Sequence, residues 1–372
     1  MAELGDNVPA YRTIRVSEPD GPVAAVADVE AWQAREAYPD VLAAAGPVFG
    51  VVRERDAGGW EVVSSFTDLA PQDARDGMGA QFRMLAQERE RAGDAAGVEE
   101  CMRAAERMEW EAVDEMTVLG SRFRVARAEC FVRSGPDGPE PPRPTDPDPT
   151  GPGDGHRAPD FTAGFVIDPA AATGMSAGIL KMELLAMVPV AGTEPPGVRE
   201  DALRAAHTHP GGVLLPATFM TAERGPRGRW RPESTCSSST PQAARDGLAM
   251  QLRVMIPWQR RLDAAARAPL MAAADRLDAE RCNELEFAGR LVRIVRVERL
   301  VRIGPDGPEG PRPCDPDPQP PVMVQHQQLR EQGVITDDED EDTPIELDEH
   351  TQRLAALYEE EEARRKTRRA EC

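Results

Sequence analysis

Apolar residues recur at helical spacing after Pro71, and the same spacing returns after Pro241. Intervals of four, four and three residues separate Ala74, Met78, Phe82 and Leu85. The second series consists of Ala244, Leu248, Leu252 and Met255. Such intervals place side chains on one face of a helix. The pattern predicts two amphipathic helices, each with one buried stripe, and Thr240 predicts an N-cap for the second.

Helix-breaking residues interrupt both patterns. Gly93 and Gly97 divide the first, and Pro269 can begin a new helix in the second. We therefore expect a helical hairpin at each place. A further helix is predicted from Pro22 to about Arg35.

Alternating stretches predict strands near the N-terminus. Residues 11–16 (YRTIRV) predict a short strand. Residues 48–55 and 60–66 predict a hairpin whose turn is Asp56–Gly59, and the matching turn later in the chain is Gly225–Gly228.

Two long stretches rich in arginine and β-branched residues predict further strands. They are residues 121–133 (SRFRVARAECFVR) and 290–302 (RLVRIVRVERLVR). Such composition is typical of a sheet with one solvent-exposed face. We therefore expect one wet face, with arginines that form ion pairs rather than bind an anion.

A proline-rich segment follows each of these strands. Residues 135–149 (GPDGPEPPRPTDPDP) and 304–318 (GPDGPEGPRPCDPDP) are identical at 13 of 15 positions. Upstream, residues 71–77 (PQDARDG) match 241–247 (PQAARDG) at an offset of 170, which has become 169 at Gly120 and Gly289. The proline spacing forbids a helix or a central strand. We call the two segments the first and second strap.

These matches predict an α+β protein built by tandem duplication. Each copy is expected to hold a mostly antiparallel sheet with a helical hairpin packed on it, in a pseudo-two-fold arrangement. The predicted parts are a first repeat with its strap (1–149), a linker (150–158), a second repeat with its strap (159–320) and an acidic tail with a terminal helix (321–372).

The tail combines an acidic run with helix signals. Asp337–Asp342 is acidic throughout and is expected to be solvated. Thr343–Glu346 has the spacing of a capping box, and glutamates stand four residues before arginine or lysine further on. A helix from about Pro344 to Arg369 is predicted, either free or weakly docked.

The composition indicates an acidic protein with a buried core. The chain has 372 residues, 40% of them hydrophobic, and a formal net charge of −21. An acidic surface argues against nucleic acid as a general partner. No charged-then-apolar leader opens the sequence and no run of 18 apolar residues occurs, which favours the cytoplasm over secretion or a membrane. The six cysteines lack Cys-x-x-Cys spacing, and three of them, Cys101, Cys236 and Cys282, match apolar residues of the other copy and are expected to pack as small hydrophobes.

Two motifs suggest chemistry but lack its other parts. His207–Pro210 (HTHP) resembles the first zinc ligands of JAMM-type isopeptidases, yet Thr218 and Thr221 stand where the serine and the aspartate would be. An ordinary loop is favoured. Cys236 lies in a Ser/Thr-rich stretch without a nameable base, and its match to Phe66 indicates a core-facing strand residue.

The straps carry paired aspartates that could attract a hard cation, namely Asp146 with Asp148 and Asp315 with Asp317. A calcium loop also needs a bidentate glutamate and a turn glycine, which these pairs lack. We therefore expect the carboxylates to face water or to pair with arginines of the sheet. No metal and no cofactor is predicted.

A polar stripe on the two long helices supplies the candidate binding residues. The stripe consists of Gln72, Asp76 and Arg83 in the first helix and of Gln242, Asp246 and Arg253 in the second. Each set falls within about 40° on a helical projection, opposite the apolar stripe. Either these residues tie the helices to Asp137 or Asp306 and Arg143 or Arg312 of the straps, or they line a ligand groove between the halves.

The helix start at residues 71–77 and the strap sequence GPDGPE together resemble an uncharacterised family of actinomycete proteins, a domain of unknown function. The resemblance extends over nearly the whole chain up to about Pro318. It implies no known reaction.

Duplication without a complete catalytic set favours a cytoplasmic, non-enzymatic binding or adaptor protein. Its two pseudo-symmetric surfaces would engage a protein or a small-molecule ligand. The alternative is a hydrolase-like enzyme with a site in the groove between the repeats, which would use Asp76, Arg83, Asp246 and Arg253.

Overall fold

The chain packs into two units, each made of segments that are far apart in the sequence. The structure is a computed structural model that describes residues 8–44, 46–189, 197–233, 235, 237–335 and 348–371. Unit 1 is formed by residues 1–132, 160–217 and 298–337. Unit 2 is formed by residues 133–159, 218–297 and 338–372. The second strap therefore belongs to unit 1 and the first strap to unit 2. The predicted boundaries of the sequence repeats stay a prediction.

Helices and antiparallel strands make up both units, so the fold class is α+β as predicted. The helices of unit 1 are η1 (Ala10–Arg12), α1 (Pro22–Ala37), α2 (Pro71–Arg91), α3 (Ala95–Trp110), α4 (Met175–Leu185), α5 (Val198–Thr208) and α9 (Val322–Glu331). Its strands are β1 (Asp40–Ala43), β2 (Val48–Glu54), β3 (Trp60–Asp68), β4 (Glu115–Val118), β7 (Val166–Ile167) and β12 (Gly307–Pro308).

Unit 2 contains the shorter list of elements. Its helices are η2 (Gly155–Arg157), α6 (Pro241–Met250), the π-helical turn η3 (Gln251–Met255), α7 (Ile256–Gln259), α8 (Ala264–Glu280) and α10 (Glu349–Glu371). Its strands are β6 (Gly138–Pro139), β9 (Trp230–Pro232) and β10 (Glu284–Phe287). Three strands belong partly to each unit, β5 (Ser121–Gly135), β8 (Gly211–Arg224) and β11 (Arg290–Gly304).

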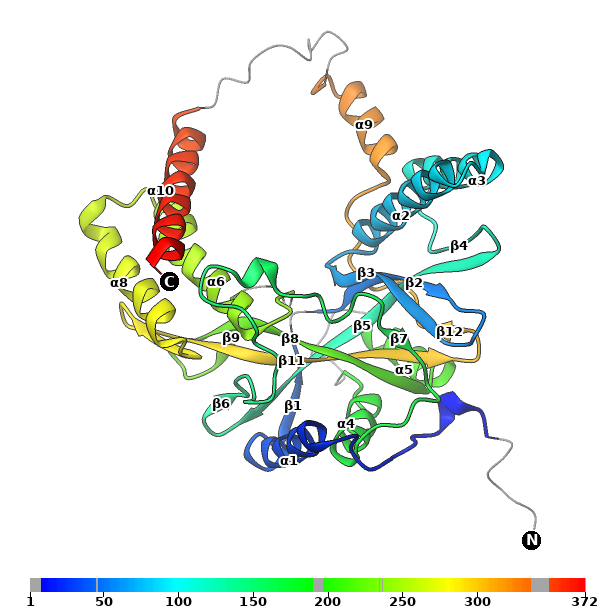
Figure 1. Ribbon diagram of the computed structural model, residues 1–372, viewed down its shortest axis with the longest axis horizontal. Coiled ribbons are helices and arrows are strands. Elements are labelled where there is room, and N and C mark those ends of the chain that lie inside the picture. The colour runs from blue at the N-terminus through cyan, green and yellow to red at the C-terminus, as the bar shows by residue number, and fades with distance from the viewer. Residues whose placement is uncertain are drawn as a thin grey trace. The chain divides into compact units, whose positions relative to one another are not determined.

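The sheet of unit 1 follows the order β7-β3-β2-β5-β11, and its helical hairpin α2–α3 packs on β2 and β3 (Figure 1). The predicted hairpin around Asp56–Gly59 is confirmed, since Val52 lies opposite Val62. The apolar stripe of α2 is confirmed as well. Its core consists of Phe49, Val51, Ala74, Met78, Phe82, Ala86, Cys101, Ala104, Ala105, Met108, Val118, Phe123 and Val125.

Unit 2 repeats this arrangement on a smaller sheet. The β8–β9 hairpin turns at Gly225–Gly228 as predicted, β10 pairs with β11, and α6, η3 and α8 pack together. Thr240 caps α6 as predicted, because its Oγ1 accepts a hydrogen bond from Ala243 N at 3.1 Å. The core consists of Phe219, Ala244, Leu248, Ala249, Leu252, Leu270, Ala273, Ala274, Leu277, Leu285, Phe287, Val292 and Ile294.

Two local predictions were wrong. Residues 11–16 do not form a strand: a 3₁₀ turn ends at Arg12, and only Val16 makes an isolated bridge, with Thr173. Pro269 does not begin α8, which starts five residues earlier because Asp263 caps it by accepting from Ala266 N at 2.9 Å. In both places a local hydrogen bond outweighs the pattern read from side-chain type.

The arginine-rich strands were expected to have one wet face, and this was wrong. Arg124 and Arg127 of β5 are 8% and 7% exposed. The second strap covers them, since Arg124 Nη1 donates to Pro308 O at 2.9 Å and Arg127 Nε to Asp315 at 3.0 Å. The expected pairing of strap aspartates with sheet arginines is thereby confirmed.

The same contacts occur in unit 2 with the first strap. Arg293 Nη1 donates to Pro139 O at 2.9 Å, and Arg296 Nε donates to Asp146 at 3.0 Å. Both arginines lie 169 residues beyond their counterparts on β5. Each strap therefore buries arginines of the sheet in its own unit and supplies their partners.

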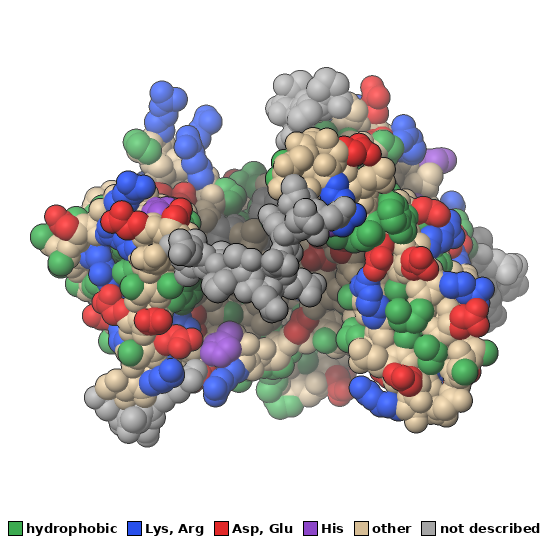
Figure 2. Space-filling view, turned by 90° about the horizontal axis from the view of Figure 1, so that it is seen from above, with side chains coloured by type: hydrophobic (Ala, Val, Ile, Leu, Met, Phe, Trp, Pro, Cys, Tyr) green, Lys and Arg blue, Asp and Glu red, His purple; other side chains and the backbone are tan. Residues whose placement is uncertain are grey.

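The tail is only partly described. Asp337–Asp342 and the capping box Thr343–Glu346 lie outside the described residues. The terminal helix is confirmed as α10, which begins at Glu349 and is docked in unit 2 through buried Leu357 and Glu361. No helix of the described residues is long and apolar enough to cross a membrane. On the face shown in Figure 2, acidic and basic side chains are intermixed.

The tip of each strap depends on a glycine that lies against a tryptophan. Gly307 has a φ of 111°, and a Cβ there would approach Trp60 Nε1 to 2.6 Å. Gly138 has a φ of 106° and faces Trp230 in the same way. An L side chain is therefore excluded by both backbone conformation and space.

We predict that Gly307→Ala lowers the free energy of unfolding by about 1–3 kcal/mol, the usual cost of a strained backbone position. Gly310→Ala is the control, because a Cβ there meets only Val125 O at 3.5 Å, an ordinary contact. Urea unfolding of both variants measures the difference. Equal stabilities would show that the strap tip adapts and that the Trp60 contact does not constrain it.

Candidate functional site

The first residues of the predicted polar stripe lie where a strap meets the start of a long helix. In unit 1, Asp317 accepts from Gln72 N at 3.0 Å and from Arg75 Nη1 at 2.5 Å. Arg75 also donates to Asp114 at 2.7 Å. A carboxylate on a free backbone N–H of the first helical turn is favoured by the helix dipole. Hydrogen bonds to Asp114 and Asp317 outweigh the effect of burial and raise the pKa of Arg75.

Unit 2 makes the matching contacts. Asp148 accepts from Gln242 N at 2.8 Å and from Arg245 Nη1 at 2.9 Å. Arg245 Nε donates to Asn283, which stands 169 residues beyond Asp114, at 3.2 Å. In both units one aspartate of a strap thus closes a helix N-terminus and neutralises a buried arginine.

The stripe lies on the helix face opposite the apolar stripe, but most of its residues are not exposed to solvent. Gln72, Gln242, Asp246 and Arg253 are buried, and only Asp76 and Arg83 are exposed. The strap covers the glutamines, and the side chain of Arg253 is enclosed by α8 and α10. Periodicity alone could not show this, because the cover comes from a distant part of the chain.

The strap partners were also predicted wrongly. Asp306 pairs with Arg122 and Arg124 of β5, and Arg312 pairs with Glu309 and Glu129. The helix is tied by Asp317 instead. Sequence reasoning missed Arg75 and Arg245 as the tying arginines, although both lie in the matched PQxARDG stretch.

The remaining stripe residues have partners within their own unit. Asp76 accepts from Gln72 Nε2 at 2.9 Å, and Asp246 accepts from Gly153 N and Gly155 N at 2.9 and 2.7 Å. Arg83 pairs with Glu109, and Arg253 pairs with Asp275 and Asp278. A binding role for the six stripe residues stays a prediction.

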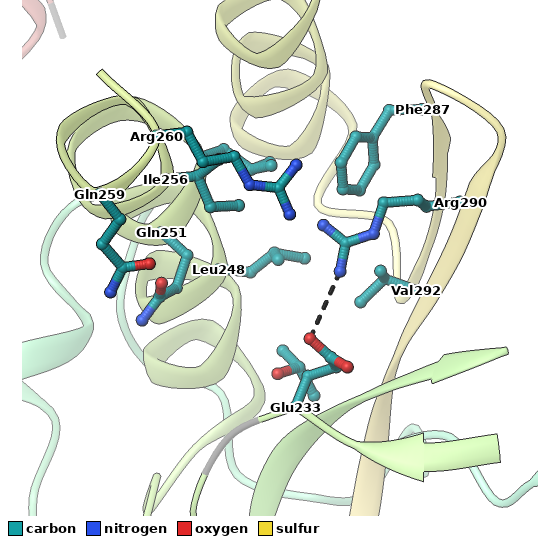
Figure 3. A pocket seen from close by; sticks show the side chains of 11 residues that line it. Glu233, Leu248, Gln251, Ile256, Gln259, Arg260, Phe287, Arg290 and Val292 are labelled. Carbon is teal, nitrogen blue, oxygen red and sulfur yellow. Dashed lines mark hydrogen bonds and ion pairs between the residues drawn. The ribbon is translucent and has the colours of Figure 1, made fainter. Parts of the chain in front are cut away.

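A pocket opens in unit 2 next to Leu248 and Leu252 of the apolar stripe (Figure 3). Its volume is about 180 Å³. The apolar wall is formed by Leu248, Leu252, Ile256, Phe287 and Val292. The polar side chains around it are Thr221, Glu233, Gln251, Gln259, Arg260 and Arg290. The guanidinium groups of Arg260 and Arg290 are both directed into the space (Figure 3).

The pocket exists because the second segment has smaller side chains than the first at two places. Leu252 matches Phe82 at an offset of 170, and Val292 matches Phe123 at an offset of 169. In unit 1 these two phenylalanines fill the space as an edge-to-face pair with ring centroids 5.2 Å apart. The polar groups are also particular to unit 2, because Ser121 stands at the position that matches Arg290.

Two glutamates share Arg290 at the pocket. Arg290 donates to both oxygens of Glu223, at 2.7 and 2.6 Å, and to Glu233 at 3.3 Å. The hydrogen bond from Arg290 lowers the pKa of Glu223. Partial burial and the nearby Glu223 carboxylate raise the pKa of Glu233. One guanidinium thus holds two carboxyl groups whose proton affinities are pushed apart.

The other candidate motifs lie elsewhere. His207 is in the last turn of α5 and not in a loop as predicted, and His209 Nδ1 is 2.9 Å from Thr208 Oγ1. Cys236 lies outside the described residues. In the part of the chain that the structure describes, no three His, Cys, Asp or Glu side chains are placed to hold one metal ion.

The fold and the site define an α+β protein with strap-covered sheets and a pocket in unit 2. Residues 21–318 match a family of unknown function, DUF5954, and the chain belongs to this family. The match ends with the second strap, so α9 and α10 lie outside it. No curated protein and no solved structure matches the chain. The predicted resemblance to a domain of unknown function is confirmed.

An acidic cluster at the start of α2 should make stability depend on pH. Burial, reinforced by Asp73 and Asp76, raises the pKa of Asp68 to about 6. The unfolded value is about 3.9, so the folded protein binds the proton more tightly and loses stability as pH rises from about 4 to about 6. The penalty persists above pH 6.

We therefore predict that Asp68→Ser, which copies the residue at matched position Ser238, stabilises the protein at pH 7. The expected gain is about 1 kcal/mol, because partial exposure reduces the full linkage energy. Thermal unfolding between pH 4 and 7 measures it, and the exposed-turn variant Asp56→Ser is the control. A gain of the same size at pH 4 would contradict the assignment.

Proposed function

We propose that the protein binds a small organic anion with an apolar body in the pocket of unit 2. The observation that carries the proposal is the pair of guanidinium groups directed into a space whose wall is apolar. The charge of Arg290 is balanced by Glu223, whereas among the described residues Arg260 forms no ion pair. A carboxylate between the two guanidinium groups would supply the missing negative charge.

The raised pKa of Glu233 fits the same ligand. Because its pKa is raised, Glu233 takes up a proton more readily than a free glutamate does, and a carboxyl group that holds its proton does not repel an anion. The apolar wall supplies the remaining affinity by removing hydrocarbon from water. A carboxylate attached to a short aliphatic or aromatic group therefore matches every side of the pocket.

Tandem duplication is part of the same proposal. It is supported by contacts that recur at constant offset, from Asp317 with Arg75 and Asp148 with Arg245 to the two strap glycines on Trp60 and Trp230. In this view the core of the first segment is filled at this place, and the second segment has a pocket at the matching place. The pseudo-two-fold arrangement and the cytoplasmic location stay predictions.

A hydrolase-like enzyme remains the second candidate. It is favoured by one observation, the two glutamates of unit 2 whose pKa values shift in opposite directions, as in carboxyl pairs that act as acid and base. These are not the four residues that the sequence suggested. Both glutamates are bound to Arg290, which favours the binding role.

We predict that small monocarboxylates bind and that their amides do not. Calorimetry and thermal shift with benzoate and hexanoate, against benzamide and hexanamide, measure the difference. Arg260→Gln should weaken carboxylate binding at least tenfold, because a hydrogen bond to a charged group contributes roughly 1.5–3 kcal/mol. Leu252→Phe with Val292→Phe should abolish binding by copying the packing of unit 1.

The matched control creates the corresponding cavity in unit 1. Phe82→Leu with Phe123→Val should cost about 2–5 kcal/mol of stability, as other cavity-forming changes do. It should not create a second carboxylate site, because unit 1 has Ser121 in place of Arg290. Equal binding of acids and amides, or unchanged binding by Arg260→Gln, would refute the proposal.

A further inference from the structure

The docking of α10 in unit 2 shows what kind of ligand the outer face of a helical hairpin accepts. Leu357 and Glu361 of α10 are 6% and 3% exposed. Glu361 lies 3.6 Å from Arg253 Nη1, and Arg364 Nη1 lies 3.3 Å from Asp278 Oδ2. The spacing i, i+4, i+7 places these three α10 residues on one helix face.

The surface beneath α10 consists of three kinds of side chain. Met271 and Leu357 both line a cavity of about 260 Å³ whose lining residues come from η3, α8 and α10. Arg253 and Asp278 receive the glutamate and the arginine of α10. Apolar side chains on both sides and two ion pairs of opposite polarity thus specify the position and the direction of the bound helix.

Unit 1 presents the same three kinds of side chain, and among the described residues only α2 and α3 line the space beside them. The core residues Cys101, Ala104, Ala105 and Met108 of α3 have the spacing of Leu270, Ala273, Ala274 and Leu277 of α8, an offset of 169. Met102 therefore matches Met271, and Glu109 matches Asp278. Arg83 matches Arg253 at the offset of 170.

These residues line a groove of about 350 Å³ on the α2–α3 hairpin. Its wall is formed by Arg83, Glu99, Met102, Arg103, Ala105, Glu106 and Glu109. All seven come from α2 or α3. Met102 is 47% exposed, and Arg83 pairs with Glu109 at the surface.

We propose that the α2–α3 groove of unit 1 binds an amphipathic helix of another protein. This helix carries leucine, glutamate and arginine at positions i, i+4 and i+7, the pattern of Leu357, Glu361 and Arg364. The leucine covers Met102, the glutamate pairs with Arg83, and the arginine pairs with Glu109. Such an acid-bearing helix in a groove is a common mode of recognition.

One difference between the units makes the partner helix distinct from α10. Trp258 holds the first turn of α10 by stacking on His350, with ring centroids 4.6 Å apart, and by donating to His350 O at 2.9 Å. Glu88 stands at the matching position of α2. The partner therefore carries a basic residue seven positions before its leucine, where α10 has His350.

The test uses the complete protein and a fluorescent peptide of residues 348–367 in which His350 is replaced by lysine. Binding is followed by anisotropy. We expect saturable binding of one peptide, weakened at least tenfold by Arg83→Glu. The peptide with Glu361→Arg should bind the Arg83→Glu protein at least tenfold better than the unchanged peptide does, which a merely unfolded variant would not allow.

Two results would overturn the proposal. If the peptide binds equally well to the Arg83→Glu protein, it exchanges with α10 in unit 2 and does not use the groove of unit 1. If sedimentation shows that the protein dimerises through Arg83, the occupant is a second copy of this chain and not another protein. Loss of carboxylate binding in unit 2 would leave the peptide result unchanged, so the two proposals fail separately.

Discussion

The structure depends on one ion pair, made twice, between a strap aspartate and an arginine at the start of a helix. Asp317 and Asp148 each accept from a free backbone N–H of the first turn and from a buried guanidinium. Both groups need this aspartate. A buried arginine without a carboxylate is costly, and so is a buried helix N-terminus without a hydrogen-bond acceptor. The strap has almost no regular secondary structure, and this ion pair holds it in place.

This constraint explains the composition of the sheet. Strand arginines at positions 124, 127, 293 and 296 are covered by a proline-rich segment and still find acceptors on it, both carbonyl oxygens and carboxylates. Proline lacks an N–H, so the strap presents acceptors without donors that would need partners of their own. A strap rich in proline and aspartate is therefore a good cover for a surface rich in arginine.

The sequence predicted the elements whose cause is local. The stripe of α2, the hairpin at Asp56–Gly59 and the cap at Thr240 follow from periodicity, turn residues and capping, and the structure has all three. Repetition revealed the straps. It could not reveal which unit each strap joins, because that depends on contacts between residues more than 90 positions apart, such as Gln242 with Asp148.

The candidate site shows the same limit. Periodicity located the stripe but could not show its exposure, since burial of Gln72 and Arg253 comes from distant segments. The pocket was not predicted at all, although its signal is in the sequence. It lies in the departures from the repeat, where Leu252 and Val292 replace two phenylalanines and Arg290 replaces a serine. Positions that are identical in the two segments hold the fold together. Positions that differ are those where a side chain can have another role.

That distinction also separates the two helical hairpins. The core faces of α3 and α8 agree in spacing and apolar character, so both hairpins meet the same packing requirement. Their outer faces agree in Met102 with Met271 and in Arg83 with Arg253, although one lies under α10 and the other is open. A solvent-exposed methionine beside an arginine contributes little to the stability of the hairpin that carries it. The proposed contact with another helix gives this methionine a role that packing within unit 1 does not supply.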